Sequence, residues 1–230
     1  MARRVVLREA LAGPTSPPAT GTATCIVDLR LPCHLACAAC WRPAPPSPGG
    51  LAAARSQLLA AATAAPEGRL RAAFYGGDVF TAPHAVAALL SDACGACEAH
   101  GRRLDALVLS DGVGWTDAAV GELTRHGVRL AQVTLDGRAA LHDRLHPLAG
   151  GGGSWDLIVA SLAEHRDALP VVVRMNAEAA DPEVEALAAA LEARGLFAGP
   201  NPVLLYVAPA APYRDQVREL LELADGAART

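Results

Sequence analysis

The sequence predicts an α/β fold, namely a partial (β/α)6 TIM-like barrel with parallel strands. Six short apolar runs alternate with six longer amphipathic segments, which is the pattern of a parallel sheet covered by helices. The chain has 230 residues, whereas a closed eightfold barrel usually takes about 250. The repeats therefore suit an open barrel of six units, and an open doubly wound sheet is the alternative.

The predicted elements follow one another in a regular order. Residues 1–21 form a leader with three prolines that we expect to be loosely ordered, and residues 22–230 form the barrel domain. The predicted strands are residues 24–29, 70–75, 104–110, 128–135, 170–174 and 202–207. The predicted helices are residues 51–64, 83–100, 117–126, 155–166, 182–194 and 213–227. A broken helical region with four glycines, residues 150–153, precedes the fourth helix.

Composition excludes several classes of protein. The formal net charge is −4, so we expect no nucleic-acid partner and no membrane-surface binding. No apolar run is long enough to span a bilayer, and the N-terminus lacks the apolar core of a signal peptide. We therefore expect a cytoplasmic protein, in which clustered thiols stay reduced and favour metal binding over disulfides.

Three cysteines, Cys33, Cys37 and Cys40, follow the first predicted strand with the spacing C-x3-C-x2-C. Three thiolates on one short loop can converge on a single metal centre, and thiolates are the normal ligands of iron–sulfur clusters. Three ligands would leave one iron of a four-iron cluster open to another ligand. A structural zinc ion usually takes four protein ligands, so zinc is an alternative, as is a loop with no metal at all.

This spacing, with Leu35 inside it, resembles the signature of the radical S-adenosylmethionine (SAM) superfamily, which often reads C-N-L-R-C-x-x-C. The chain departs from that signature at His34, Ala36 and Ala39. An aromatic residue is common where Ala39 stands, and Trp41 lies close by. The resemblance implies a [4Fe–4S] cluster on the three cysteines, with SAM as its second cofactor.

Two further runs stand at the ends of predicted strands. Gly76, Gly77 and Asp78 occupy the place of the family's G-G-E, which receives the amino group of SAM. Asp78 is one methylene shorter than glutamate, so we expect a longer or water-bridged contact. Ser110 opens a run that resembles the family's T-N-G. An ordinary glycine turn is the alternative reading of each run.

Three elements in order resemble the peptide-modifying branch called SPASM-type, whose pattern is S-x-D-G, H-D-x-x-R and G-S-F/Y-D. They are residues 134–137, 141–144 and 152–156. Thr134 stands where a SAM-contacting serine is usual, and Asp136 is either a catalytic proton acceptor or a strand-end cap. His146 occupies the place of the family's arginine, so Arg144 is the candidate for the SAM carboxylate. Arg174 resembles the start of the family's R-x-N strand end, and a basic cap at the barrel rim is its alternative.

The resemblance implies reductive cleavage of SAM to methionine and a 5′-deoxyadenosyl radical that takes hydrogen from a peptide or protein substrate. A reductant such as flavodoxin or ferredoxin would supply the electron. SPASM-type enzymes carry a cysteine-rich C-terminal extension, and no cysteine follows Cys97 here, so a partner subunit is a further expectation. The alternatives are a glycyl-radical activase, a small-molecule radical SAM enzyme, and a degenerate non-catalytic partner subunit.

Overall fold

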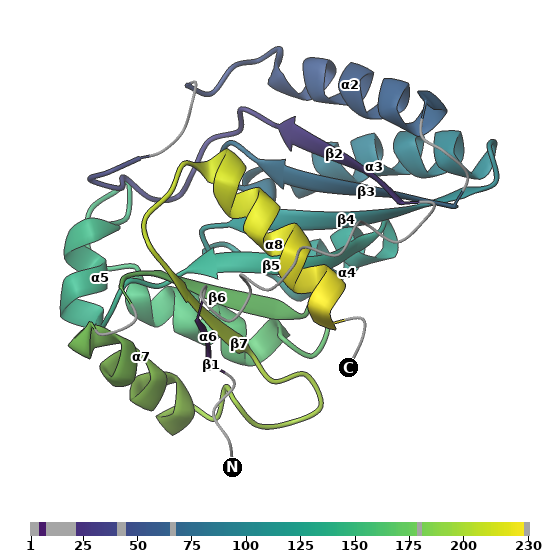
Figure 1. Cartoon of the computed structure of the whole chain (residues 1–230). Helices are drawn as coiled ribbons and strands as arrows, with labels where there is room; N and C mark the ends of the chain where they lie inside the picture. Colours follow the sequence, from purple (N-terminus) through teal and green to yellow (C-terminus); the bar gives the residue numbers. More distant parts are fainter. Residues whose placement is uncertain (1–4, 8–21, 41–44, 65–67, 179–180, 228–230) are drawn as a thin grey trace.

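The computed structural model describes residues 5–7, 22–40, 45–64, 68–178 and 181–227 of the chain (Figure 1). Its strands form one parallel sheet in the order β1-β7-β6-β5-β4-β3-β2. They are β1 (Val5–Leu7), β2 (Thr22–Asp28), β3 (Gly68–Tyr75), β4 (Arg102–Ser110), β5 (Val128–Thr134), β6 (Val171–Asn176) and β7 (Leu204–Ala208). From β3 to β7 each strand pairs with its predecessor, whereas the order of a doubly wound sheet reverses. The predicted partial (β/α)6 barrel is confirmed.

The helices follow the strands as the sequence predicts, with ends that differ by a few residues. They are α2 (Gly50–Ala64), α3 (Pro83–Glu98), α4 (Asp117–Arg125), α5 (Ala139–Leu145), α6 (Trp155–His165), α7 (Pro182–Ala193) and α8 (Tyr213–Ala227), with a short 3-10 helix η1 (Val79–Thr81). The broken helical region resolves into α5 and a glycine-containing turn before α6.

Alternate side chains of the strands face two different cores. Val108 and Val173 belong to the larger core, together with apolar residues of α2, α3, α4, α6 and α7. Leu107 and Val172, one position earlier in each strand, belong to a second core on the opposite face. Strands that are buried on both faces appear in the sequence as continuous apolar runs. This explains why these strands could be predicted from the sequence.

Helix α8 covers the second face of the sheet. It crosses the strands on the viewer's side in Figure 1 and contacts β3 and β4. Its residues Val217, Leu220 and Leu221 complete the second core. This second face is the inner face of the partial barrel. Its apolar side chains are covered by α8. The sequence pattern identifies the helix but not the face that it covers.

The N-terminal strand β1 pairs in parallel with β7 and adds a strand that the sequence did not predict. It comes from the segment predicted to be a leader, of which residues 1–4 and 8–21 lie outside the described residues. Within the described part of the chain, no helix combines the length and the apolar character needed to cross a membrane.

Candidate functional site

A pocket opens at the carboxyl ends of the strands, where parallel α/β folds place their chemistry. Its walls come from the segment of residues 29–40, here called the cysteine loop, from the ends of β3 to β6, and from the starts of α8 and of the turn after α5. The lining residues are Cys33, Leu35, Cys37, Tyr75, Gly76, Gly77, Leu109, Ser110, Asp111, Gln132, Thr134, His146, Asn176 and Gln216.

Backbone hydrogen bonds hold the cysteine loop on two sides of this pocket. The Leu31 N–H donates to the carbonyl of Gly76 over 2.7 Å, next to the end of β3. The Ala36 N–H donates to the carbonyl of Pro147 over 2.8 Å, in the turn after α5. The loop is therefore fixed between two elements that are far apart in the sequence.

The predicted metal ligands all lie on this loop. Cys33 and Cys37 line the pocket, and Cys40 is exposed at the end of the loop. The described cysteines are free thiols, so no disulfide competes for these three. Cys94 and Cys97 lie on α3, and burial raises the pKa of both thiols, which suits small packing residues better than reactive ones.

Gly76 and Gly77 line the pocket and also make room for the cysteine loop. Their φ angles are +86° and +101°, a region that side-chain-bearing residues rarely adopt. A Cβ atom at Gly77 would lie 2.0 Å from the carbonyl oxygen of Leu31, and one at Gly76 would lie 1.8 Å from Asp28 Oδ1. Gly77 therefore allows the close approach of the Leu31 backbone, and Gly76 leaves room for the Asp28 side chain.

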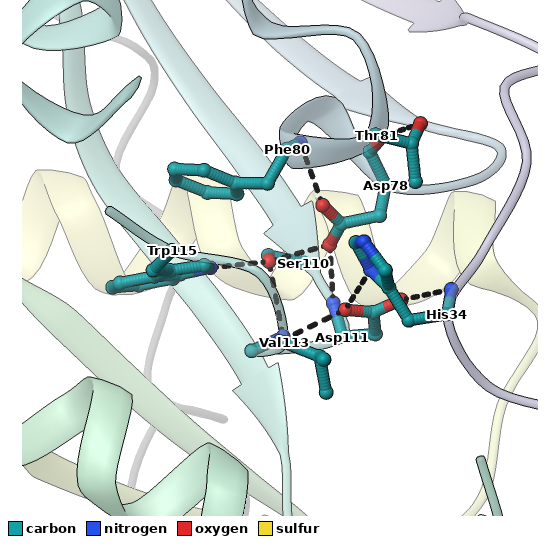
Figure 2. Close-up of polar contacts among 9 residues, drawn as sticks. His34, Asp78, Phe80, Thr81, Ser110, Asp111, Val113 and Trp115 are labelled. Atoms are coloured by element: carbon teal, nitrogen blue, oxygen red, sulfur yellow. Dashed lines mark hydrogen bonds and ion pairs between the residues drawn. The ribbon is translucent and has the colours of Figure 1, made fainter. Parts of the chain in front are cut away.

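Asp78 is fully buried and is not among the lining residues of the pocket. Its carboxylate accepts hydrogen bonds from the Phe80 N–H at 2.7 Å, the Ser110 hydroxyl at 2.5 Å and the Asp111 N–H at 2.6 Å (Figure 2). Burial, together with the charge of Asp111, raises the pKa of Asp78 to about 8. The carboxylate ties η1 to the end of β4, so this geometry leaves it poorly placed for the predicted contact with a SAM amino group.

Asp111 fastens the cysteine loop to the end of β4. Its Oδ2 atom accepts the His34 N–H over 2.8 Å, and both of its carboxylate oxygens lie 3.1 Å from His34 Nδ1 (Figure 2). The hydrogen bond to Asp111 raises the pKa of His34. His34, Asp78 and Asp111 bring metal-ligating atoms together, but internal hydrogen bonds already engage both carboxylates. The cluster therefore acts as a clamp on the residue next to Cys33.

Replacing Asp111 with alanine should lower the free energy of unfolding by about 1–3 kcal/mol. The change removes the acceptor of the part-buried His34 and Val113 N–H groups. Urea unfolding measures the loss, with Asp167→Ala as a control because Asp167 is exposed. Equal unfolding midpoints for the two variants would show that the clamp contributes nothing.

His146 bridges Asp136 and Cys37 at the edge of the pocket. Its Nε2 atom lies 2.7 Å from Asp136 Oδ2, and its Nδ1 atom lies 3.2 Å from Cys37 Sγ. Burial opposes its charge, but hydrogen bonds to Asp136 and Cys37 raise the pKa of His146 to about 9. Burial would likewise raise the pKa of Asp136, but bonds from His146 and Asn176 hold it below its ordinary value. Asp136 is not itself a lining residue, but it contacts two residues that are, His146 and Asn176.

The sequence run that resembles H-D-x-x-R and G-S-F/Y-D joins α5 to the start of α6. Asp143 Oδ1 accepts the N–H groups of Ser154 and Trp155, each over 2.8 Å. His142 Nε2 lies 3.1 Å from the Ser154 hydroxyl. A Cβ atom at Gly153 would lie 2.3 Å from Asp143 Oδ2. These residue types are therefore explained by local packing and helix capping.

The buried His142 should make the protein less stable in acid. Burial lowers the pKa of His142 to about 4, while an unfolded histidine takes up its proton near pH 6.5. The unfolded state then binds more protons between these values, so stability falls as the pH drops from 6.5 toward 4, by about 3 kcal/mol over the window. Urea unfolding of the native protein and His142→Gln at several pH values tests this, because parallel stability curves would contradict it.

The two arginines predicted to bind SAM lie away from the lining of the pocket. Arg144 is exposed on α5. Arg174 is fully buried and forms an ion pair with Glu219 of α8, so its guanidinium fastens that helix to the sheet. Ser110 and Thr134 do line the pocket, and their contact with SAM stays a prediction.

The pocket wall also contains polar residues that were not among the predicted site residues, including Asp111, Gln132, His146, Asn176 and Gln216. The sequence carried a signal for Gln132, because this polar residue interrupts the apolar run of residues 130–133. Gln216 carried none, because only the placement of α8 on the inner face brings it to the pocket. Gln132 and Gln216 lie 3.5 Å apart between Nε2 and Oε1.

No protein-family model and no curated protein sequence matches the chain. Solved structures do resemble it. The anSMEcpe structure with bound AdoMet, which is SAM, has 13% identity and a TM-score of 0.53, with 67% of this chain covering 43% of that one. SuiB of Streptococcus suis, bound to its precursor peptide SuiA, has 11% identity and a TM-score of 0.59. The match covers 84% of this chain and 40% of SuiB. Methylornithine synthase PylB has 11% identity and a TM-score of 0.52. The match covers 82% of this chain and 53% of PylB. The chain thus spans about half of these proteins or less, and the likeness is one of fold.

Proposed function

We propose that this chain, which has the fold of radical SAM enzymes, is itself a radical SAM enzyme. In this proposal Cys33, Cys37 and Cys40 ligate a [4Fe–4S] cluster beside the pocket, and SAM binds in the pocket. The observation that carries the proposal is the position of the cysteines. In a sheet of this order, their loop follows the carboxyl end of β2, and two of the thiols line the pocket.

The residues present fit such a cluster. Three free thiols on one loop are the right donor type, and the loop that carries them is clamped through His34 and through its bonds to Gly76. When bound, the reduced cluster supplies the electron that cleaves SAM into methionine and a 5′-deoxyadenosyl radical. The protein's own contribution is to hold these groups and keep water away from them.

The pocket wall offers SAM a different set of contacts from the family pattern. Gly76 and Gly77 present backbone at the end of β3, and Ser110 and Thr134 present hydroxyl groups at the ends of β4 and β5. The Asp78 carboxylate already accepts three hydrogen bonds from η1 and the end of β4. We therefore infer that hydroxyl and backbone groups, rather than the Asp78 carboxylate, hold the methionine end of SAM.

The substrate class in this proposal is a peptide or a protein side chain. Its support is that the SuiB structure contains a precursor peptide and that one anSMEcpe structure contains the Kp18Cys peptide. The reductant would be a flavodoxin or ferredoxin, and a partner subunit would be a further protein partner. Hydrogen abstraction makes the enzyme an oxidoreductase in the maturation of peptide natural products.

A second candidate function is a non-catalytic partner subunit that keeps the fold without the chemistry. Three observations favour it: Asp78 is engaged by the β4 turn, Arg174 is paired with Glu219, and Gln216 of α8 enters the pocket. The two candidates differ in whether the isolated protein turns over SAM.

Product analysis separates the two functions. The protein is reconstituted with iron and sulfide without oxygen, reduced with dithionite and incubated with SAM. The proposed enzyme forms 5′-deoxyadenosine, even without a peptide, at a rate above that of free iron–sulfur cluster in buffer. A rate equal to that background, from protein that holds its full complement of iron, would favour the non-catalytic partner.

A further inference from the structure

The imidazole of His146 lies between two groups that both accept hydrogen bonds. Its Nδ1 atom faces Cys37 Sγ at 3.2 Å, and its Nε2 atom faces Asp136 Oδ2 at 2.7 Å. A thiolate and a carboxylate can only accept. When Cys37 is a metal-bound thiolate its sulfur is an acceptor, and Nδ1 of His146 is placed to donate a hydrogen bond to it.

The ring is held from several sides. Asp136, just after β5, accepts the backbone N–H of Asn176 over 2.7 Å, so the carboxylate has a fixed position. The His142 ring packs against that of His146 at 4.9 Å between centroids. The His146 carbonyl accepts the Ser154 hydroxyl over 2.6 Å. With 15% of its side chain exposed, His146 has little freedom to turn away from Cys37.

We propose that His146 is a positioning residue for the iron–sulfur cluster: its Nδ1–H donates to the sulfur of Cys37, and Asp136 holds the ring in that orientation. This inference rests on the proposed function and goes beyond it, because it assigns a role to the position where the resemblance implied a SAM-binding arginine. Asp136 then acts through His146 and takes no proton from a substrate.

The expected consequence is a higher reduction potential of the cluster. Reduction adds negative charge to the cluster and its ligand sulfurs, and an N–H donor on a sulfur stabilises that charge. Partners that orient such a donor share in the effect. The Asp136–His146–Cys37 arrangement therefore makes the cluster easier to reduce than the three cysteines alone would.

The test is a redox titration of the reconstituted protein at one fixed pH, followed by EPR. His146→Phe keeps a ring but removes both donors, and we expect its potential to shift to a more negative value. His146→Gln keeps an N–H that can reach toward sulfur and should recover part of the shift. Asp136→Asn should shift the potential in the same direction by a smaller amount. His84→Phe, a change at an exposed ring on α3, should leave the potential unaltered.

Iron content separates the possible failures. Wild-type protein without a cluster would overturn the proposed function and this inference with it. A cluster in His146→Phe with the wild-type potential would overturn the inference alone and leave the proposed function standing. If His146→Phe holds no iron, then wild-type potentials in both His146→Gln and Asp136→Asn would overturn it. A pulsed EPR signal from an exchangeable proton near the cluster, lost in His146→Phe, is the matching spectroscopic expectation.

Discussion

The Cys37→Ala variant is expected to hold no [4Fe–4S] cluster and to form no 5′-deoxyadenosine above the background rate. Cys37 occupies the middle of the ligand set and lines the pocket, so its loss leaves two thiols for a cluster that needs three from the protein. Its sulfur is also the acceptor for His146, which would then face an empty position.

The measurement is iron and sulfide content together with the colour of the reconstituted protein. Cys94→Ala is the matched control, because Cys94 is a part-buried thiol on α3 outside the pocket lining. Circular dichroism of each variant shows whether the fold is kept. A folded Cys37→Ala protein with a full four-iron cluster and undiminished SAM cleavage would remove this cysteine from the ligand set.

Loss of Glu219 is expected to destabilise the fold strongly, because it removes the partner of a buried arginine. Arg174 is fully buried and pairs with Glu219, whose side chain is 7% exposed. Glu219→Ala leaves the guanidinium buried without its counter-charge, which typically costs about 3–5 kcal/mol. The same change would loosen α8 over the inner face of the sheet, where Gln216 contributes to the pocket wall.

Urea unfolding of two further variants tests whether the ion pair is the cause. Asp215→Ala breaks the exposed pair with Arg218 on the same helix and should cost less than about 1 kcal/mol. The double change Arg174→Met and Glu219→Leu replaces the pair with apolar side chains and should recover most of the stability. If Glu219→Ala unfolds at the same urea concentration as the native protein, the pair does not hold α8 in place.

Strands β2 to β7 and their parallel arrangement could be predicted, because the signal of each strand is local. Runs such as residues 106–109 are buried on both faces, so their apolar character is continuous, and the intervening helices favour parallel pairing. The face covered by α8 could not be predicted in this way. The amphipathic pattern of a helix shows that one side is buried but not which surface buries it.

Part of the pocket lining could be predicted for the same reason. Cys33, Cys37, Gly76, Gly77 and Thr134 stand at strand ends, and the topology alone brings strand ends together. The directions of individual side chains depend on their partners in space. The Asp78 carboxylate satisfies three donors away from the pocket lining, and Arg174 meets Glu219, which lies 45 positions later in the chain. No spacing in the sequence carries that information.

His146 shows how a departure from a familiar pattern can carry information. At the sequence level it appeared only as the place where an arginine was missing. The structure puts its ring between Cys37 and Asp136, two residues that the sequence analysis had assigned to separate roles. Cys37 on the cysteine loop and Asp136 at the end of β5 belong to one network only because α5 positions the turn that carries His146.

The central claim is that the cysteine loop holds a cluster with one iron open to SAM. The most direct test is EPR of the anaerobically reconstituted, reduced protein with and without SAM. The claim predicts a [4Fe–4S] signal whose line shape changes when SAM is added and which is absent when Cys33, Cys37 and Cys40 are all replaced by alanine. A protein that binds no cluster, or one whose signal is the same with and without SAM, would contradict it.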